Sequence, residues 1–198
     1  MKKIAILLFV CAGITGAANA QIQFSAGPGA GFNYAVHTSS DDETISRFGV
    51  LLTSQFDIQF SRLLGLLVWV DFYSGMSAGQ NVEGLSGEYQ ISYLHLSPTL
   101  KFCLPGSPFY LFGGPGAGFR TKGRMKVSYE GLSMEEDIPD MNIRFDARFG
   151  AGYDIFLSKK ITLSPFVAFN AGLNNVAADT DWKIHALQAG LVLRYNAF

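Results

Sequence analysis

Residues 143–157 read IRFDARFGAGYDIFL, and every second residue of this stretch is apolar. The odd positions contain no polar residue apart from one tyrosine, whereas the even positions include Arg144, Asp146 and Asp154. In an extended chain, a two-residue repeat puts successive side chains on opposite faces. The stretch is also longer than the about five or six residues of a typical strand in a soluble protein. It therefore predicts a long strand with one apolar face and one polar face.

The same alternation recurs seven more times along the chain. It spans residues 21–36, 48–60, 64–76, 88–104, 109–126, 161–173 and 182–198. Within residues 88–104 the apolar phase shifts by one residue near Tyr93, which is typical of a β-bulge. Short turns alternate with long polar loops, which we expect at residues 77–87 and 127–142 among others. Eight strands connected in this way predict an all-β fold, an eight-stranded antiparallel up-and-down transmembrane β-barrel.

The polar faces of these strands decide between a soluble carrier and a membrane barrel. They are rich in glycine, serine, asparagine and glutamine, and they contain a few charges of both signs. Water would favour more lysine and glutamate, whereas small residues and opposite charges suit the narrow interior of a membrane barrel. We therefore expect the apolar faces to meet lipid and a structural network of polar residues to fill the lumen. Its expected members are Asp57, Asp71, Lys101, Arg144, Asp146, Arg148, Asp154 and Arg194.

The N-terminus predicts export. Two lysines precede the apolar run IAILLFV at residues 4–10, and small residues lead to Ala-Asn-Ala at 18–20. This order is typical of a secretory signal peptide, so we expect a signal peptide over residues 1–20 and a barrel domain over residues 21–198. Loss of the two lysines changes the net charge from −1 to −3, because residues 1–20 contain no acid.

The two cysteines add little to the covalent structure. Cys11 would mark a lipoprotein, but Val10 stands where a lipoprotein signal requires a small residue. Cys103 is then alone after cleavage, so we expect no internal disulfide.

One region of the chain resembles a known family. Residues 93–102 (YLHLSPTLKF) and 108–119 (PFYLFGGPGAGF), with a Pro-Gly turn between them, are similar to the PorT-like outer-membrane β-barrels widespread in Bacteroidetes. Residues 161–176 look like the seventh strand of that family. The matching positions in the first region are Pro98, Lys101, Tyr110, Gly114, Pro115 and Gly118. The resemblance implies an eight-stranded outer-membrane barrel, mostly without an assigned activity, with some members serving protein secretion linked to gliding.

The sequence contains no recognisable catalytic or metal-binding motif. The glycine-rich segment 113–118 lacks the Lys-Ser/Thr of a phosphate-binding loop. Outer-membrane barrels that deacylate lipid A carry a histidine followed two residues later by a serine on a late strand, but Leu187 follows His185 at that spacing. His37 and His95 are interpreted as isolated histidines without metal-ligand spacing. We therefore expect no enzyme activity, no metal and no cofactor.

We expect the protein to lie in the cell outer membrane, with both termini periplasmic and the long loops outside. The expected partners are outer-membrane lipid, the barrel-assembly machinery during biogenesis, and a surface or periplasmic protein of unknown identity. A slightly negative net charge without a basic patch argues against nucleic acid. The expected function is structural, interactive or accessory to secretion. A small porin-like pore is the alternative, and a lipid-A-modifying enzyme is a further alternative.

Overall fold

The computed structural model describes residues 22–38, 45–82, 85–129, 132–138, 141–177 and 181–197, so the expected signal peptide lies outside the described residues. The described residues form one antiparallel sheet of 11 strands. The strands are β1 (Gln23–Thr38), β2 (Ile45–Gln59), β3 (Leu64–Gly75), β4 (Ala78–Val82), β5 (Leu85–Cys103), β6 (Phe109–Tyr129), β7 (Leu132–Asp137), β8 (Arg144–Tyr153), β9 (Ile155–Phe156), β10 (Ile161–Gly172) and β11 (Lys183–Asn196). Across these ranges, no helix is long and apolar enough to cross a membrane.

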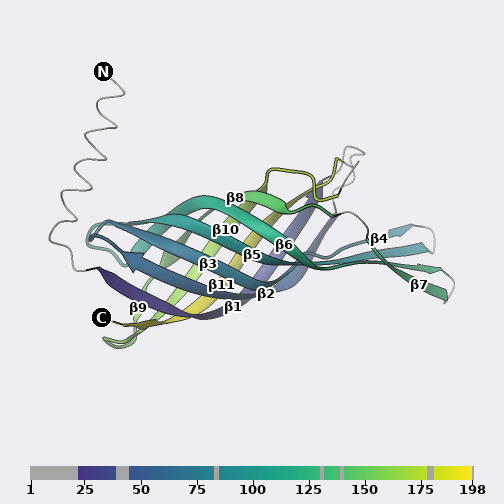
Figure 1. Cartoon of the computed structure of the whole chain (residues 1–198). Coiled ribbons are helices and arrows are strands. Elements are labelled where there is room, and N and C mark those ends of the chain that lie inside the picture. The colour runs from purple at the N-terminus through teal and green to yellow at the C-terminus, as the bar shows by residue number, and fades with distance from the viewer. Residues whose placement is uncertain are drawn as a thin grey trace, which may run out of the picture.

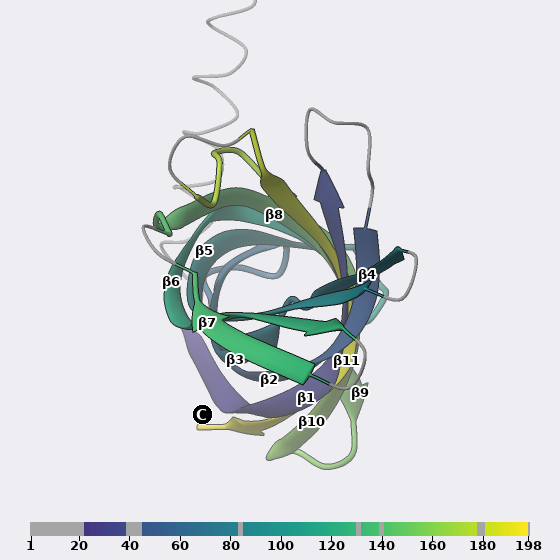
Figure 2. The same ribbon diagram turned by 90° about the vertical axis from the view of Figure 1, so that its right-hand side faces the viewer.

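Eight of the strands close into a barrel, which Figure 2 shows along its axis. The order around the ring is β1-β2-β3-β5-β6-β8-β10-β11, and β11 pairs back with β1. Closure leaves no open edge in the ring, as a membrane-spanning sheet requires. The predicted eight-stranded antiparallel barrel is confirmed.

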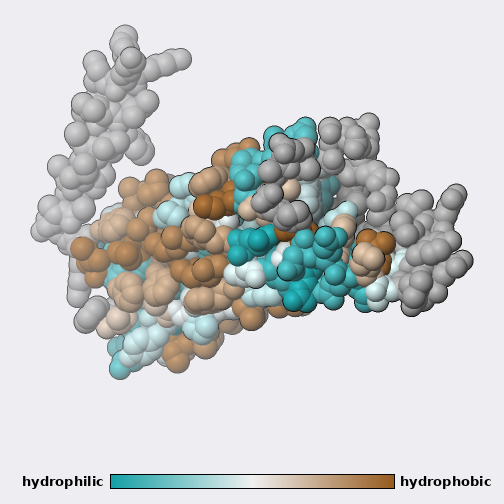
Figure 3. Space-filling model, turned by 45° about the vertical axis from the view of Figure 1, so that its right-hand side comes forward, coloured by the Kyte–Doolittle hydropathy of each residue, from teal (hydrophilic) through white to brown (hydrophobic). Residues whose placement is uncertain are grey.

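The stretch that predicted the fold forms β8 and β9. Its odd positions face outward, and the Phe145 and Phe149 side chains are each 51% exposed, whereas Arg144 and Arg148 on the even positions are buried. The strand assignment is interrupted at Asp154, whose backbone N–H donates to the carbonyl of Pro108 and so continues the register of β8 with β6. Figure 3 shows the result on the outer surface, where apolar side chains gather over the barrel wall.

The two ends of the barrel differ. One end, which we call the turn end, contains the short connections 60–63, 104–108 and 157–160 together with the start of β1 and the end of β11. At the opposite end, β5 and β6 continue beyond the ring and pair with β4 and β7. These four segments form a projecting sheet, visible on the right of Figure 1. We call this the hairpin end.

The projecting sheet corrects two predictions. Residues 77–87 and 127–142 were both expected to be loops, but the first contains β4 and the second contains β7. β4 pairs with the first residues of β5, from Ala78 opposite Tyr89 to Val82 opposite Leu85. Such hairpins lie beyond the ring, so their sequences do not need the apolar alternation of strands that face lipid.

The bulge predicted near Tyr93 is confirmed. The register between β5 and β6 shifts between Ser92 and Tyr93, and the register between β3 and β5 shifts between Asp71 and Ser74. Both shifts occur where the ring gives way to the projecting sheet. A bulge bends and twists a strand, which suits a strand that leaves the barrel wall.

Two glycines of β6 make room inside the barrel. A Cβ atom on Gly114 would lie 2.3 Å from the carbonyl oxygen of Pro98, and one on Gly116 would lie 2.3 Å from Oδ1 of Asp146 and 2.7 Å from the ring of His95. Only glycine therefore fits at these two positions without a shift of its neighbours. The glycine-rich segment serves close packing in a narrow barrel.

Candidate functional site

The structure brings the eight polar residues expected in the lumen into two groups. The turn-end network comprises Asp57, Lys101, Asp154 and Arg194. The central network comprises Asp71, Arg144, Asp146 and Arg148, and His95 joins it. Asp154 is the most accessible of the eight, with a side chain 12% exposed, and the others are nearly or completely buried. Each set of four contains two acids and two bases, so the charges within each group balance.

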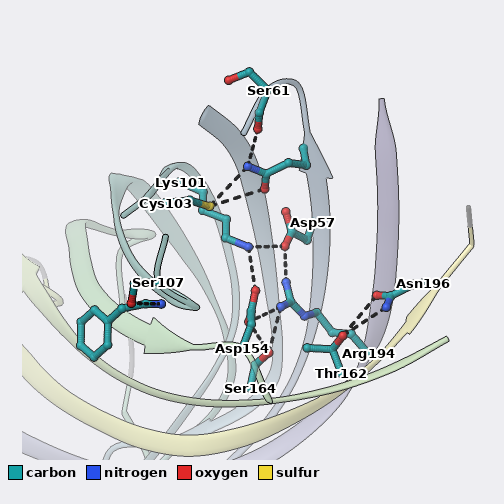
Figure 4. Close-up of polar contacts among 12 residues, drawn as sticks. Asp57, Ser61, Lys101, Cys103, Ser107, Asp154, Thr162, Ser164, Arg194 and Asn196 are labelled. Atoms are coloured by element: carbon teal, nitrogen blue, oxygen red, sulfur yellow. Dashed lines mark hydrogen bonds and ion pairs between the residues drawn. The ribbon is translucent and has the colours of Figure 1, made fainter. Parts of the chain in front are cut away.

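The turn-end network holds four strands and the β8–β9 break together (Figure 4). Nζ of Lys101 lies 2.7 Å from Oδ2 of Asp57 and 3.1 Å from Oδ2 of Asp154. The Arg194 guanidinium donates to the same two carboxylates through its two terminal nitrogens. It also donates to Oγ of Ser164, which in turn donates to Asp154 over 2.7 Å. Two cations thus alternate with two carboxylates, an arrangement that compensates the cost of removing each charge from water.

The central network is built around His95. Nε2 of His95 lies 2.8 Å from Oδ2 of Asp146, and Nδ1 lies 3.5 Å from Oδ2 of Asp71. Nη1 of Arg148 donates to Asp71 over 2.9 Å, and Nη2 of Arg144 lies 3.4 Å from Asp146. The histidine therefore bridges two separate arginine–aspartate pairs.

A mainly apolar layer separates the two networks, with the buried Gln55 and Ser97 opposite Trp69 on the neighbouring strands. On β3, Trp69 lies between Leu67, near the turn end, and Asp71 of the central network. The Trp69 ring centroid lies 5.2 Å from that of Phe112 and 4.7 Å from that of Phe166. We call this layer the aromatic plug. It comprises Leu51, Leu67, Trp69, Tyr110, Phe112, Phe166, Ala168 and Val192.

Cations from both networks cover the aromatic plug. Nζ of Lys101 lies 4.4 Å from the centre of the Tyr110 ring, and the guanidinium carbon of Arg148 lies 4.3 Å from the centre of the Trp69 ring. At these distances a cation is attracted by the electrons of the ring face. The charged and apolar layers of the interior are therefore in direct contact.

The interpretation of His95 as an isolated histidine is wrong. Besides the two aspartates, its Nδ1 lies 3.0 Å from Oγ of Ser97, so Ser97, His95 and Asp146 form a serine–histidine–acid arrangement that the sequence did not reveal. The sequence signal for this arrangement is a histidine followed two residues later by a serine, and it lies on β5. Lipid-A deacylases carry that motif on a late strand, where this chain lacks it. The acid comes from β8, 51 residues away from His95.

The position of this arrangement argues against catalysis. The side chains of Ser97, His95 and Asp146 are at most 1% exposed, and they are enclosed by the central network and the aromatic plug. A hydrolytic serine must reach a substrate carbonyl, and a lipid acyl chain would lie outside the barrel wall. Within the described ranges, no group of three histidine, cysteine or acidic side chains could hold a metal ion.

A cavity opens at the turn end, with the turn-end network as its floor. Its volume is about 1410 Å³, and we call it the vestibule. Above the floor, Nε2 of Gln59 donates to the carbonyl of Ser61 over 2.7 Å and lies 3.3 Å from Sγ of Cys103. Figure 4 shows Ser61 and Cys103 above the charged floor. The vestibule is thus an open chamber with apolar walls and a charged floor, and the aromatic plug lies beyond that floor, where Lys101 contacts Tyr110.

Several solved structures share this fold. Ail of Yersinia pestis has 14% sequence identity and a TM-score of 0.50, with 86% of this chain and 97% of that chain covered. Neisserial surface protein A has 14% identity and a TM-score of 0.50, with 87% and 96% covered. OprG of Pseudomonas aeruginosa has 12% identity and a TM-score of 0.52, with 91% and 98% covered. At these identities the likeness establishes the fold and not a function.

Sequence comparison gives the family directly. A search of curated proteins finds no match to this chain. The family model for the outer membrane protein beta-barrel domain matches residues 5–195, which is nearly the whole chain. The match agrees with the closed ring, its outward apolar face and its polar interior. The chain belongs to the outer membrane protein β-barrel domain family.

Proposed function

We propose that this outer-membrane barrel is a closed, non-catalytic protein that presents its projecting sheet to a protein partner. The observation that carries the proposal is the layered interior, in which the aromatic plug lies between two charge-balanced networks. Both termini and the short turns then face the periplasm, and the hairpin end faces outward, as short periplasmic turns and longer external segments are the rule for such barrels.

The alternative of a small pore needs a continuous polar path. An eight-stranded barrel is only wide enough for side chains to fill it. Here the side chains of Leu67, Trp69 and Val192 are completely buried in the plug, so ions entering the vestibule meet a mainly apolar layer without charged side chains. A related observation supports the non-catalytic role, because the buried Ser97 and His95 face the interior and not the lipid.

We expect the purified protein, reconstituted into lipid bilayers that contain lipid A, to show no steady conductance at neutral pH. The same preparation is expected to leave the lipid A unmodified. Single-channel recording and thin-layer chromatography check the two expectations, with a reconstituted porin as the positive control for conductance. Steady channels would favour the pore, and an altered acylation pattern would favour the enzyme.

The projecting sheet supports the interaction role because it ends in an edge strand. β7 pairs only with β6 among the described strands, so its other side offers unpaired backbone groups. Tyr129 pairs with Leu132 across the hairpin, and the alternation of antiparallel pairing then turns the backbone groups of Ser133, Glu135 and Asp137 away from β6. An exposed edge of this kind can accept an added strand from a partner.

The charges of β7 indicate what kind of partner strand could pair with its free edge. Glu135, Glu136 and Asp137 are exposed, and like charges on two copies of β7 would repel each other. Among these three acids, Glu135 and Asp137 form ion pairs in the described structure, both with Arg124, at 2.8 Å and 3.5 Å, and Lys126 lies opposite Glu135 on β6. A basic extended segment would complement this edge.

Replacing Glu135 with proline is expected to weaken binding of a basic peptide of alternating lysine and valine about tenfold, because it removes one outward N–H group and one charge. Glu135→Gln keeps the N–H group and is expected to lose only the salt-dependent part of the affinity. Glu136→Gln removes an equal charge from the opposite face of the hairpin and is the matched control. Fluorescence anisotropy in nanodiscs measures the affinities, and equal binding by all three variants would contradict strand addition at β7.

The finer assignment to the PorT-like group, with a role accessory to secretion, is part of the same proposal. It is supported by the motif at residues 93–119, whose two halves lie on neighbouring strands β5 and β6. Within that motif, Gly114 allows the close approach of Pro98, and Lys101 takes part in the turn-end network. The motif residues therefore have structural roles in the interior of this chain.

A further inference from the structure

The vestibule has an excess of positive charge. The charged side chains that line it are Asp57, Arg62, Lys101, Asp154, Lys159 and Arg194, which is four cations against two acids. The turn-end network uses two of these cations and both acids among themselves. Arg62 and Lys159 remain, and within the described ranges neither forms an ion pair. The excess charge of +2 therefore belongs to these two residues.

Both residues lie at the mouth of the vestibule. Arg62 is in the turn 60–63 and Lys159 is in the turn 157–160, and both side chains are exposed. The three short turns read FSRL, LPGSP and LSKK, so they contain basic residues and no acid. By contrast, the hairpin end exposes charges of both signs, for example Arg124 with Glu135. The three short turns of the turn end therefore carry charge of a single sign.

The inner vestibule supplies hydrogen-bonding side chains and the electrostatic field of fixed charges. Gln59, Thr162 and Asn196 form a polar belt between the mouth and the floor. On the floor, Nε of Arg194 is buried and has no hydrogen-bond partner in the described structure. A cavity with low-dielectric walls and an excess of charge of one sign concentrates counter-ions. An anion that enters between Arg62 and Lys159 thus meets the side-chain amides of Gln59 and Asn196 below them.

We propose that the vestibule binds a phosphate-bearing ligand, with Arg62 and Lys159 as the residues that hold the phosphate. Phosphate suits this place because outward aromatic residues, including Phe109 and Tyr153, surround the mouth as a girdle does at the level of lipid headgroups. The ligand is therefore either the headgroup of an anionic phospholipid or a soluble phosphate ester. The proposal is independent of whether the barrel conducts or binds a strand at β7.

The test uses the full-length protein in a detergent without phosphate groups, with inorganic phosphate and pyrophosphate as probes. Calorimetric titration is expected to show saturable binding that is about tenfold weaker in Arg62→Gln/Lys159→Gln, because two charged contacts are lost. The matched control is Lys160→Gln/Arg124→Gln, which removes two exposed positive charges that do not line the vestibule. We expect this control to bind within about twofold of the unaltered protein.

A second arm separates the two sources of phosphate. Native mass spectrometry from nanodiscs of phosphatidylglycerol and phosphatidylcholine measures retained lipid. Retention of phosphatidylglycerol that depends on Arg62 and Lys159, without binding of either soluble probe, assigns the site to lipid headgroups. Binding of the soluble probes without retained lipid assigns it to a soluble phosphate ester. An equal loss in the control variant, or no binding in either arm, overturns the proposal.

Discussion

Replacing Arg194 with methionine is expected to lower the free energy of unfolding of the barrel by about 3–5 kcal/mol, the cost of breaking a buried ion pair by removing one partner. Arg194 donates to both Asp57 and Asp154 and to Ser164. Without it, the two carboxylates share only Lys101, and one negative charge is left uncompensated inside the barrel. Methionine keeps much of the side-chain length, so the expected loss reflects charge and hydrogen bonding more than volume. Urea titration of the folded protein in detergent micelles measures the effect.

A second substitution distinguishes charge balance from packing. Asp154→Asn in the Arg194→Met background restores neutrality, since Asp57 and Lys101 then remain as a pair 2.7 Å apart. The double variant is therefore expected to be more stable than Arg194→Met alone. Arg124→Met is the matched surface control, and because its ion pair is about half-exposed we expect a loss of about 1 kcal/mol or less. A double variant no more stable than the single one would remove charge balance from the explanation.

The barrel was predictable because lipid and lumen impose opposite demands on alternate residues. In residues 143–157 the outward positions are apolar and the inward positions include Arg144, Asp146 and Arg148, so one face of the strand could be assigned to each environment. The bulge near Tyr93 was equally visible, because a one-residue shift moves the apolar residues to the other phase. Both features are local, and a single strand is enough to reveal them.

The projecting sheet was not predictable from the same pattern. β4 reads AGQNV and β7 reads LSMEED, and neither faces lipid on one side. Without a boundary between lipid and water, polar and apolar residues need not alternate, so polar hairpins read as loops. Strand pairing beyond the ring is determined by the register with β5 and β6, which the sequence does not show.

The inward charges were predictable, but their partners were not. Arg148 and Asp71 are 77 residues apart, and their 2.9 Å contact depends on the register of the whole ring. His95 could have been placed in the lumen, because the bulge puts Leu94 and Leu96 on the lipid face and His95 between them. Its contact with Asp146 again depends on the register between strands. The sequence therefore predicts which side chains enter the interior but not which of them meet.

The layering of the interior explains why a barrel with so many buried charges can stay closed. Each set of four charges balances within itself, so neither network needs a counter-ion to be neutral. The apolar layer between them is then free to exclude water, and Arg148 contacts it through the face of Trp69 instead of through a hydrogen bond. Closure and stability thus depend on the same few side chains at the plug.

Replacing Trp69 with alanine is therefore expected to affect both properties. Trp69 is completely buried and contacts Phe112, Phe166 and Arg148, so its loss is expected to lower the free energy of unfolding by about 3–5 kcal/mol. The space it leaves lies between the two polar networks, which allows water to connect them. We expect Trp69→Ala to show ion conductance in planar bilayers where the unaltered protein shows none.

Two variants control for the loss of the indole ring. Trp69→Phe keeps an aromatic ring in the plug and is expected to remain closed, with a smaller loss of stability. Phe149→Ala removes an outward-facing ring at the lipid surface and is expected to leave conductance unchanged. Bilayer recordings and urea unfolding of the same preparations provide both readouts. Trp69→Ala could instead unfold at the same urea concentration as the unaltered protein and show no conductance. The loss of the central ring would then change neither property, so the aromatic plug would be neither the barrier to ions nor a main source of stability.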